Sequence, residues 1–219
     1  MNKDEKRFVT EGTIKALITF IPGIGGAIGS ILGDALADRK EQRINKFLED
    51  LRTALEQHKE KVNEQFIKNE DFLDVFEIAT RTIAQERNEQ KRTAFKNIFV
   101  NGIITPDASY DDVEYQFKIL EQLNEDHLRL LSLFYKPELF AIRNMNSTIG
   151  GSLMTLFREA FPDWTKDYLV DMLTDLEKNR LIESMTGNLQ TMMSRISTDQ
   201  FKNRITSKGA KLIDFIVLD

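Results

Sequence analysis

The stretch from Ala16 to Gly33 contains no charged residue, although 30% of the chain is charged. Within it Gly25, Gly29 and Gly33 recur every four residues. On a helix this spacing places the three glycines along one edge, where another backbone can approach closely. The chain must therefore fold so that this stretch packs against a neighbouring helix, against another copy of the chain, or in lipid.

The length of this stretch argues against a single transmembrane span. As one helix, residues 16–33 would measure about 27 Å, just short of a hydrocarbon core of about 30 Å. Pro22 interrupts that helix, because proline lacks a backbone donor and clashes with the preceding turn. The apolar piece after Pro22 reaches a charge at Asp34. We therefore expect a helical hairpin, and a re-entrant or interfacial position in a membrane remains open.

Two interpretations of the hairpin remain. In the first, the hairpin is packed within the molecule and its glycines only allow two helices of the same chain to touch. In the second, the hairpin is the effector and packs in a membrane or an oligomer after a trigger. Glycine costs roughly 1 kcal/mol relative to alanine in a helix. This number of glycines therefore favours a role beyond filling space between helices. The hairpin residues that we single out are Pro22, Ile24, Gly25, Ile28, Gly29, Leu32 and Gly33.

Composition restricts the chemistry that the chain can perform. There is no cysteine, and the two histidines, His58 and His127, lie far apart in the sequence. We expect His127 to cap its helix or to lie at the surface rather than to bind a metal. No nucleophile is accompanied by a base and an orienting group, and IPGIGGAIG lacks the Lys-Ser/Thr of a phosphate-binding loop. We therefore expect a non-enzymatic protein without metal or cofactor.

The first half of the chain reads as a helical bundle. Apolar residues at helical spacing predict helices over about 6–20, 25–59 and 70–101. The segment NGIITPDASYDD follows, with Gly102, Pro106 and Ser109, and is the clearest linker in the chain. We place a domain boundary there, so that residues 1–104 form the bundle and residues 105–219 form a second domain. The formal net charge of −5 belongs to the second domain.

The second half has the element order of a winged helix-turn-helix. Helices are predicted over about 110–122, 125–135, 153–160, 165–179 and 208–217, with short strands at 181–183 and 204–206. Thr206 begins a Thr-x-x-Gly sequence that opens the closing helix. The expected fold class is mainly α, with an N-terminal helical bundle that carries the glycine-rich hairpin and a C-terminal winged-helix-like domain with a small β-hairpin.

DNA binding by this domain is not favoured. The helix in the position of a recognition helix carries Asp167, Asp171 and Asp175 at four-residue spacing, plus Glu177, and would turn a negative ridge toward phosphates. The opposing cations form a group that we name the basic cluster: Arg195, Lys202, Arg204, Lys208 and Lys211. We favour a protein-contact module with a solvated acidic face, and a winged-helix DNA-binding regulator is the alternative.

Five segments of the chain follow one another in a recognisable order: GSILGDALADRKEQRINKFLEDL, EQKRTAFKNIF, FKILEQLNEDHLRLLSLFY, LVDMLTDLEKNRLIE and RITSKGAKLIDFI. In this order they resemble the Abi-alpha family of bacterial abortive-infection proteins. They span most of residues 24–216 and are patterns rather than an invariant motif. The resemblance implies a role in phage defence or growth arrest, with membrane perturbation as one mechanism. It supplies no catalytic residues.

Together these patterns predict a non-enzymatic, abortive-infection-type or toxin-like bacterial protein. The glycine-rich hairpin would mediate oligomerisation or membrane association, and the winged-helix-like domain would regulate it. We expect self-association or a partner protein, with a membrane surface retained as a partner and nucleic acid not favoured. The expected location is cytoplasmic, with peripheral membrane association open. A plain scaffold for protein–protein interactions is a further alternative.

Overall fold

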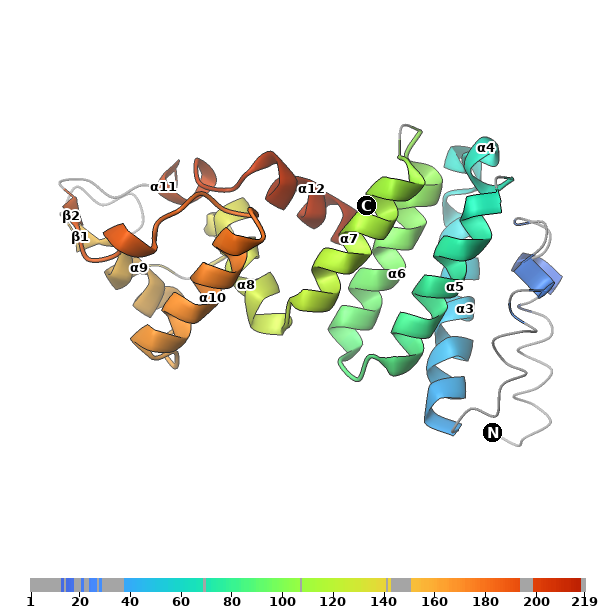
Figure 1. Cartoon of the computed structure of the whole chain (residues 1–219), viewed down its shortest axis with the longest axis horizontal. Coiled ribbons are helices and arrows are strands. Elements are labelled where there is room, and N and C mark those ends of the chain that lie inside the picture. Colours follow the sequence, from blue (N-terminus) through green and yellow to red (C-terminus); the bar gives the residue numbers. More distant parts are fainter. Residues whose placement is uncertain are drawn as a thin grey trace. The chain divides into compact units, whose positions relative to one another are not determined.

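The chain is mainly helical, as the sequence predicts (Figure 1). The computed structural model describes residues 13, 15–17, 21, 24–26, 28, 38–68, 70–106, 108–140, 142, 151–193 and 199–217. These residues belong to two compact units, one comprising Met1–Glu121 with Phe215–Asp219 and the other comprising Gln122–Asp214.

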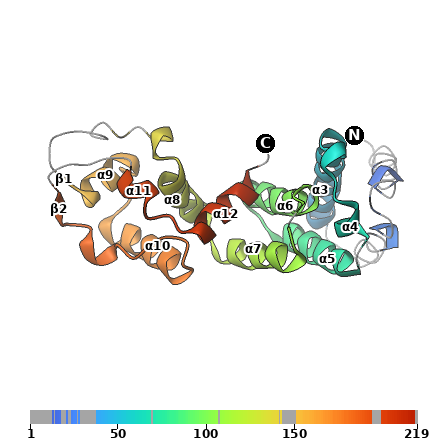
Figure 2. The ribbon, with the colours of Figure 1, turned by 90° about the horizontal axis from the view of Figure 1, so that it is seen from above.

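The first unit is built from amphipathic helices that pack side by side. Both views place α3, α5 and α6 next to one another (Figures 1 and 2), and each of the three contacts the other two. Beyond the helical residues 15–17 and 24–26, its elements are α3 (Asp38–Gln57), η1 (Lys59–Lys61), α4 (Glu64–Ile67), α5 (Glu70–Gln85), α6 (Glu89–Ile104) and α7 (Tyr110–Gln122).

Phenylalanine rings form the centre of this unit. Phe47 of α3 lies 6.2 Å from Phe76 of α5 and 6.3 Å from Phe99 of α6, measured between ring centroids. On the next layer, Phe95 of α6 stacks on Phe117 of α7 at 5.2 Å. All five rings are buried, and such aromatic pairs contribute about 0.5–1.5 kcal/mol each beyond their buried area. The helical spacing of the apolar residues therefore places them in one shared core.

The single helix that we predict over 70–101 is wrong, because the chain turns between α5 and α6. Asn88 caps α6, since its side chain accepts a hydrogen bond from the N–H of Lys91. The Glu86 carboxylate accepts a hydrogen bond from the N–H of Asn88, and Arg92 Nη1 donates to the carbonyls of Glu86 and Arg87. The charged sequence AQERNEQKR thus supplies a turn between two antiparallel helices, not the middle of one.

The second unit contains shorter elements. They are α8 (Glu125–Tyr135), η2 (Pro137–Leu139), β1 (Gly151–Ser152), α9 (Leu153–Ala160), α10 (Lys166–Lys178), η3 (Thr186–Asn188), β2 (Met192–Met193) and α11 (Asp199–Lys202), followed by the start of α12 (Ser207–Ile216). Helix α8 contacts both α10 and α11. Phe134, Phe157 and Phe201 pack together in the core, with ring centroids 5.4–6.1 Å apart.

Strand structure is scarce in the described part of this unit. The predicted strands at 181–183 and 204–206 meet only in one antiparallel bridge, between Ile182 and Ile205. The N–H of Glu183 donates to the Arg204 carbonyl, and the N–H of Thr206 donates to the Leu181 carbonyl. A two-stranded antiparallel sheet joins β1 to β2 elsewhere, with Gly151 opposite Met193, and the sequence patterns do not predict it.

The division between the two units differs from the boundary expected at residues 104 and 105. It falls between Glu121 and Gln122, and the end of α12 is grouped with the first unit. Helix α7 belongs to the first unit because Phe117 stacks on α6. The linker residues around Pro106 therefore connect two helices of one unit. Asn101 of α6 donates hydrogen bonds to the carbonyls of Phe215 and Val217, which fastens the end of α12 to the same unit.

Candidate functional site

The apolar N-terminal stretch is described at only a few positions, and four of the aliphatic side chains at those positions are covered. Leu17, Ile21 and Ile24 are fully buried, and Ile28 is 2% exposed. Their burial needs no lipid and no second copy of the chain. Gly25 is half-buried, whereas its neighbour Gly26 is exposed. Of the other hairpin residues that we single out, Pro22, Gly29, Leu32 and Gly33 lie outside the described residues.

Gly26 faces open space. A Cβ atom built on Gly26 would have no heavy-atom neighbour within 4 Å. A side chain at this position is therefore compatible with the monomer, although it would obstruct any backbone that approaches this surface from outside. The described part of the stretch thus combines buried aliphatic side chains with an open glycine.

The basic cluster in the second unit is engaged by contacts within the chain. Lys202 Nζ lies 3.2 Å from the Glu138 carboxylate. Arg204 Nη1 donates to the Ser184 carbonyl at 3.2 Å, and Lys208 Nζ donates to the Asn179 carbonyl at the end of α10. Lys211 is exposed on α12, and Arg195 lies outside the described residues. These contacts stabilise helix ends and loops, as cations near helix C-termini commonly do.

The acidic ridge of α10 is only partly a solvated face. Asp167 and Asp171 are exposed, whereas Asp175 lies 3.3 Å from Lys178 Nζ and 3.5 Å from His127 Nε2. The Glu177 carboxylate accepts hydrogen bonds from the backbone N–H groups of residues 185 and 186, at 2.7 Å and 2.9 Å. Glu177 therefore holds the loop after α10 instead of forming part of an exposed acidic face.

His127 has the capping role that the sequence favours. Its Nδ1 accepts a hydrogen bond from the N–H of Asn124, and the Asn124 side chain accepts one from the N–H of His127. This reciprocal arrangement is a capping box at the start of α8. The ring is buried rather than at the surface, because α10 covers it.

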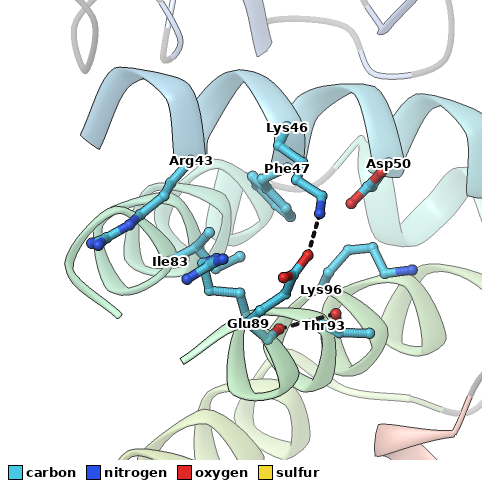
Figure 3. Close-up of a pocket in the computed structure, with 9 residues that line it drawn as sticks. Arg43, Lys46, Phe47, Asp50, Ile83, Glu89, Thr93 and Lys96 are labelled. Carbon is cyan, nitrogen blue, oxygen red and sulfur yellow. Dashed lines mark hydrogen bonds and ion pairs between the residues drawn. The ribbon is translucent and has the colours of Figure 1, made fainter. Parts of the chain in front are cut away.

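The sequence patterns do not predict a charged groove that the structure forms in the first unit. Figure 3 shows it between α3 and α6, with Ile83 of α5 and Phe47 as its apolar floor. Its charged and polar lining comes from α3 and α6, and we call these seven residues the charged groove: Arg43, Lys46, Asp50, Glu89, Arg92, Thr93 and Lys96. The groove brings together residues of α3 and α6 that lie about 40 or more positions apart in the sequence, so only tertiary structure reveals it.

The charged side chains of the groove differ in their hydrogen-bond partners and in the direction in which their pKa values shift. Lys46 donates a hydrogen bond to Glu89 (Figure 3), which raises the pKa of Lys46 and lowers that of Glu89. Burial raises the pKa of Asp50, and the nearby Lys96 ammonium partly opposes this. Burial lowers the pKa of Lys96, with Asp50 opposing. Arg43 Nη1 donates to the carbonyl of Ala84 at the end of α5, so that guanidinium also has a structural role.

The enclosed part of the groove is small. Its volume is about 20 Å³, which is room for about one water molecule. This volume does not accommodate an organic cofactor. What the groove provides is four cationic side chains and two carboxylates around a narrow opening to solvent, an arrangement that attracts small anions to its rim.

Among the residues that the structure describes, no helix combines the length and the apolar character needed to cross a bilayer. In the same residues, no three acidic or histidine side chains converge as metal ligands would. Comparison of the chain with protein-family models, with curated proteins and with solved structures found no match.

Proposed function

We propose that this chain is a non-enzymatic bacterial defence protein of the abortive-infection or toxin-like type. Its glycine-rich N-terminal hairpin mediates self-association or membrane association, and its winged-helix-like second unit regulates that step. The resemblance of residues 24–216 to the Abi-alpha family supports this proposal. The order α8, α9, α10, the bridge between Ile182 and Ile205, and α12 supports the winged-helix part.

One observation carries the proposal: in the uncharged, glycine-rich stretch, the described aliphatic side chains of Leu17, Ile21, Ile24 and Ile28 are buried while Gly26 stays open. In the resting molecule these four side chains add almost no exposed apolar surface. An open glycine permits the close backbone approach that small residues give helix pairs. A trigger that loosens the hairpin would add the aliphatic side chains of Leu17, Ile21, Ile24 and Ile28 to the contact.

The test is to express the full chain and to measure growth arrest, and in parallel to measure dye release from anionic liposomes. We expect wild type to arrest growth and to release dye or self-associate. Gly29→Leu and Gly26→Leu are expected to weaken these effects, because leucine blocks close backbone approach. Gly187→Leu is the matched control, since a Cβ at Gly187 also has no neighbour within 4 Å and lies in the other unit.

Three outcomes contradict the proposal. The first is a wild type that neither arrests growth nor associates with liposomes or with itself. The second is equal activity of wild type and both hairpin variants. The third is an equal loss in the Gly187→Leu control, which would indicate that any added leucine disturbs the chain.

A further inference from the structure

Lys96 differs from the other lysines that line cavities of the first unit. Lys46 is paired with Glu89, and Lys91 Nζ lies 3.3 Å from the Glu86 carboxylate. Within the described ranges, Lys96 has no carboxylate within 4 Å of its Nζ. It is half-buried in the charged groove, and its ammonium extends beneath Asp50 (Figure 3). Its amine is therefore not held in an ion pair.

We propose that Lys96 is a site of covalent acylation by anionic acyl donors of the acyl phosphate class. The groove that contains it also carries Arg43, Lys46 and Arg92 against the two carboxylates Asp50 and Glu89. Even with Lys96 neutral, cations outnumber carboxylates there. A phosphate-bearing donor is thus drawn to the rim of the groove, next to the one amine that has no ion-pair partner.

The chemical step is an ordinary acyl transfer. The neutral Lys96 amine attacks the carbonyl carbon of the acyl phosphate, and a C–N bond forms as the C–O bond to phosphorus breaks. Inorganic phosphate leaves with the electron pair, and the amine proton passes to water. No oxidant, metal or further reactant takes part. The product is a neutral amide in place of a cation, so Asp50 loses one of the two lysine charges that act on it.

The surroundings of Lys96 favour the neutral amine that this step needs. Burial lowers the pKa of Lys96, and the Asp50 carboxylate opposes that effect. Each unit by which a lysine pKa falls increases the neutral fraction at neutral pH about tenfold. Lys46, which faces the same groove, has a raised pKa because of its hydrogen bond to Glu89. The two lysines of one groove are therefore expected to react at very different rates.

The experiment treats the full, folded chain with acetyl phosphate at neutral pH and measures the occupancy of each lysine by peptide mass spectrometry. Lys96 is expected to react several-fold faster than Lys61, which is exposed, and faster still than Lys46. The preference should vanish when the chain is unfolded in urea. A Lys96 rate equal to or below that of Lys61 in the folded chain overturns the proposal.

Two further arms separate amine reactivity from attraction of the anion. An uncharged acetylating ester is expected to modify Lys96 with a smaller preference over Lys61 than acetyl phosphate does, because the basic rim does not attract it. Asp50→Asn is expected to increase acetylation of Lys96, because it removes the carboxylate that raises the pKa of Lys96. An equal preference for both reagents contradicts the role of the rim, and a slower reaction in Asp50→Asn contradicts the role of the amine.

Discussion

Gly209, in the first turn of α12, is the position where one added methyl group should be most damaging. A Cβ built there lies 2.1 Å from the backbone oxygen of Leu181. That oxygen also accepts hydrogen bonds from the N–H and the hydroxyl of Thr206, both at 3.1 Å. Gly209→Ala must therefore push apart two backbone segments that are already hydrogen-bonded, because the nearest atom to the new Cβ belongs to the backbone and not to a flexible side chain.

The cost follows from three terms. Overpacking of a filled site costs about 1–3 kcal/mol, and weakening one backbone hydrogen bond costs about 1 kcal/mol. Alanine recovers up to about 1 kcal/mol of helix propensity relative to glycine. With all three terms counted, we expect Gly209→Ala to lower the free energy of unfolding by about 1–3 kcal/mol.

The chain has one tryptophan, and it reports on the unit that contains Gly209. Trp164 stacks on Phe161 with ring centroids 4.1 Å apart, so its fluorescence follows the packing of the second unit. Urea unfolding followed by this fluorescence measures the change. Gly187→Ala is the control, because a Cβ there meets nothing within 4 Å, and it should be as stable as wild type or slightly more stable. Equal unfolding free energies for Gly209→Ala and wild type would refute the steric argument.

Three further predictions concern stability. Glu177→Ala should lower the free energy of unfolding by about 2–4 kcal/mol, because it removes the acceptor of two backbone N–H groups. In the same urea titration, the control Glu114→Ala removes an exposed ion pair and should change the free energy of unfolding by less than about 1 kcal/mol. Asn101→Leu should lower the free energy of unfolding by about 1–2 kcal/mol and speed hydrogen exchange at the end of α12, since two carbonyls lose their donor. Unchanged exchange rates would contradict the role of Asn101 in holding the end of α12. Burial raises the pKa of Glu86, but hydrogen bonds from the Asn88 N–H and a nearby lysine outweigh it and hold that pKa below its ordinary value. The stabilisation by Glu86 is therefore complete above the unfolded-state pKa of about 4.3 and is lost as pH falls through the lower folded-state pKa. The difference in unfolding free energy between wild type and Glu86→Gln should therefore shrink on acidification. A difference that does not depend on pH would contradict this prediction.

The sequence predicts those elements whose signals are local. The bounds of α7, α8 and α9 agree with the predicted ranges 110–122, 125–135 and 153–160. Each of these helices has a polar residue at its start whose side chain accepts a hydrogen bond from the backbone, namely Ser109, Asn124 and Ser152. The Thr-x-x-Gly sequence expected to open the closing helix does so, since the Thr206 hydroxyl accepts a hydrogen bond from the N–H of Gly209 at the start of α12.

The sequence patterns fail where tertiary contacts determine the local structure or the role of a side chain. The turn between α5 and α6 contains no glycine or proline. Only its hydrogen bonds identify it: the Asn88 side chain accepts one from the N–H of Lys91, and Arg92 donates one to the Glu86 carbonyl. In the sequence, Glu177 belongs to a row of acidic residues at helical spacing. In the structure its carboxylate accepts a backbone hydrogen bond from the loop after α10. The charged groove joins residues of α3 to residues of α6, a proximity that no local spacing records.

We propose that the glycine surface of the N-terminal stretch meets lipid or a second chain. The chain has no cysteine, and Gly26 has open space around a built Cβ. A single cysteine placed by Gly26→Cys, and labelled with a polarity-sensitive fluorophore, therefore reports directly on what covers this surface. The matched probe is Gly187→Cys in the second unit.

The measurement is the emission of the Gly26→Cys probe as anionic liposomes are added, and separately as the protein concentration is raised. If the glycine surface meets lipid, we expect the probe's emission to shift to shorter wavelength when liposomes are added. If the surface meets a second copy of the chain, we expect the emission to shift with protein concentration in the absence of liposomes. In both cases the Gly187→Cys probe should stay unchanged. Emission at Gly26→Cys that is constant under both conditions would contradict the claim.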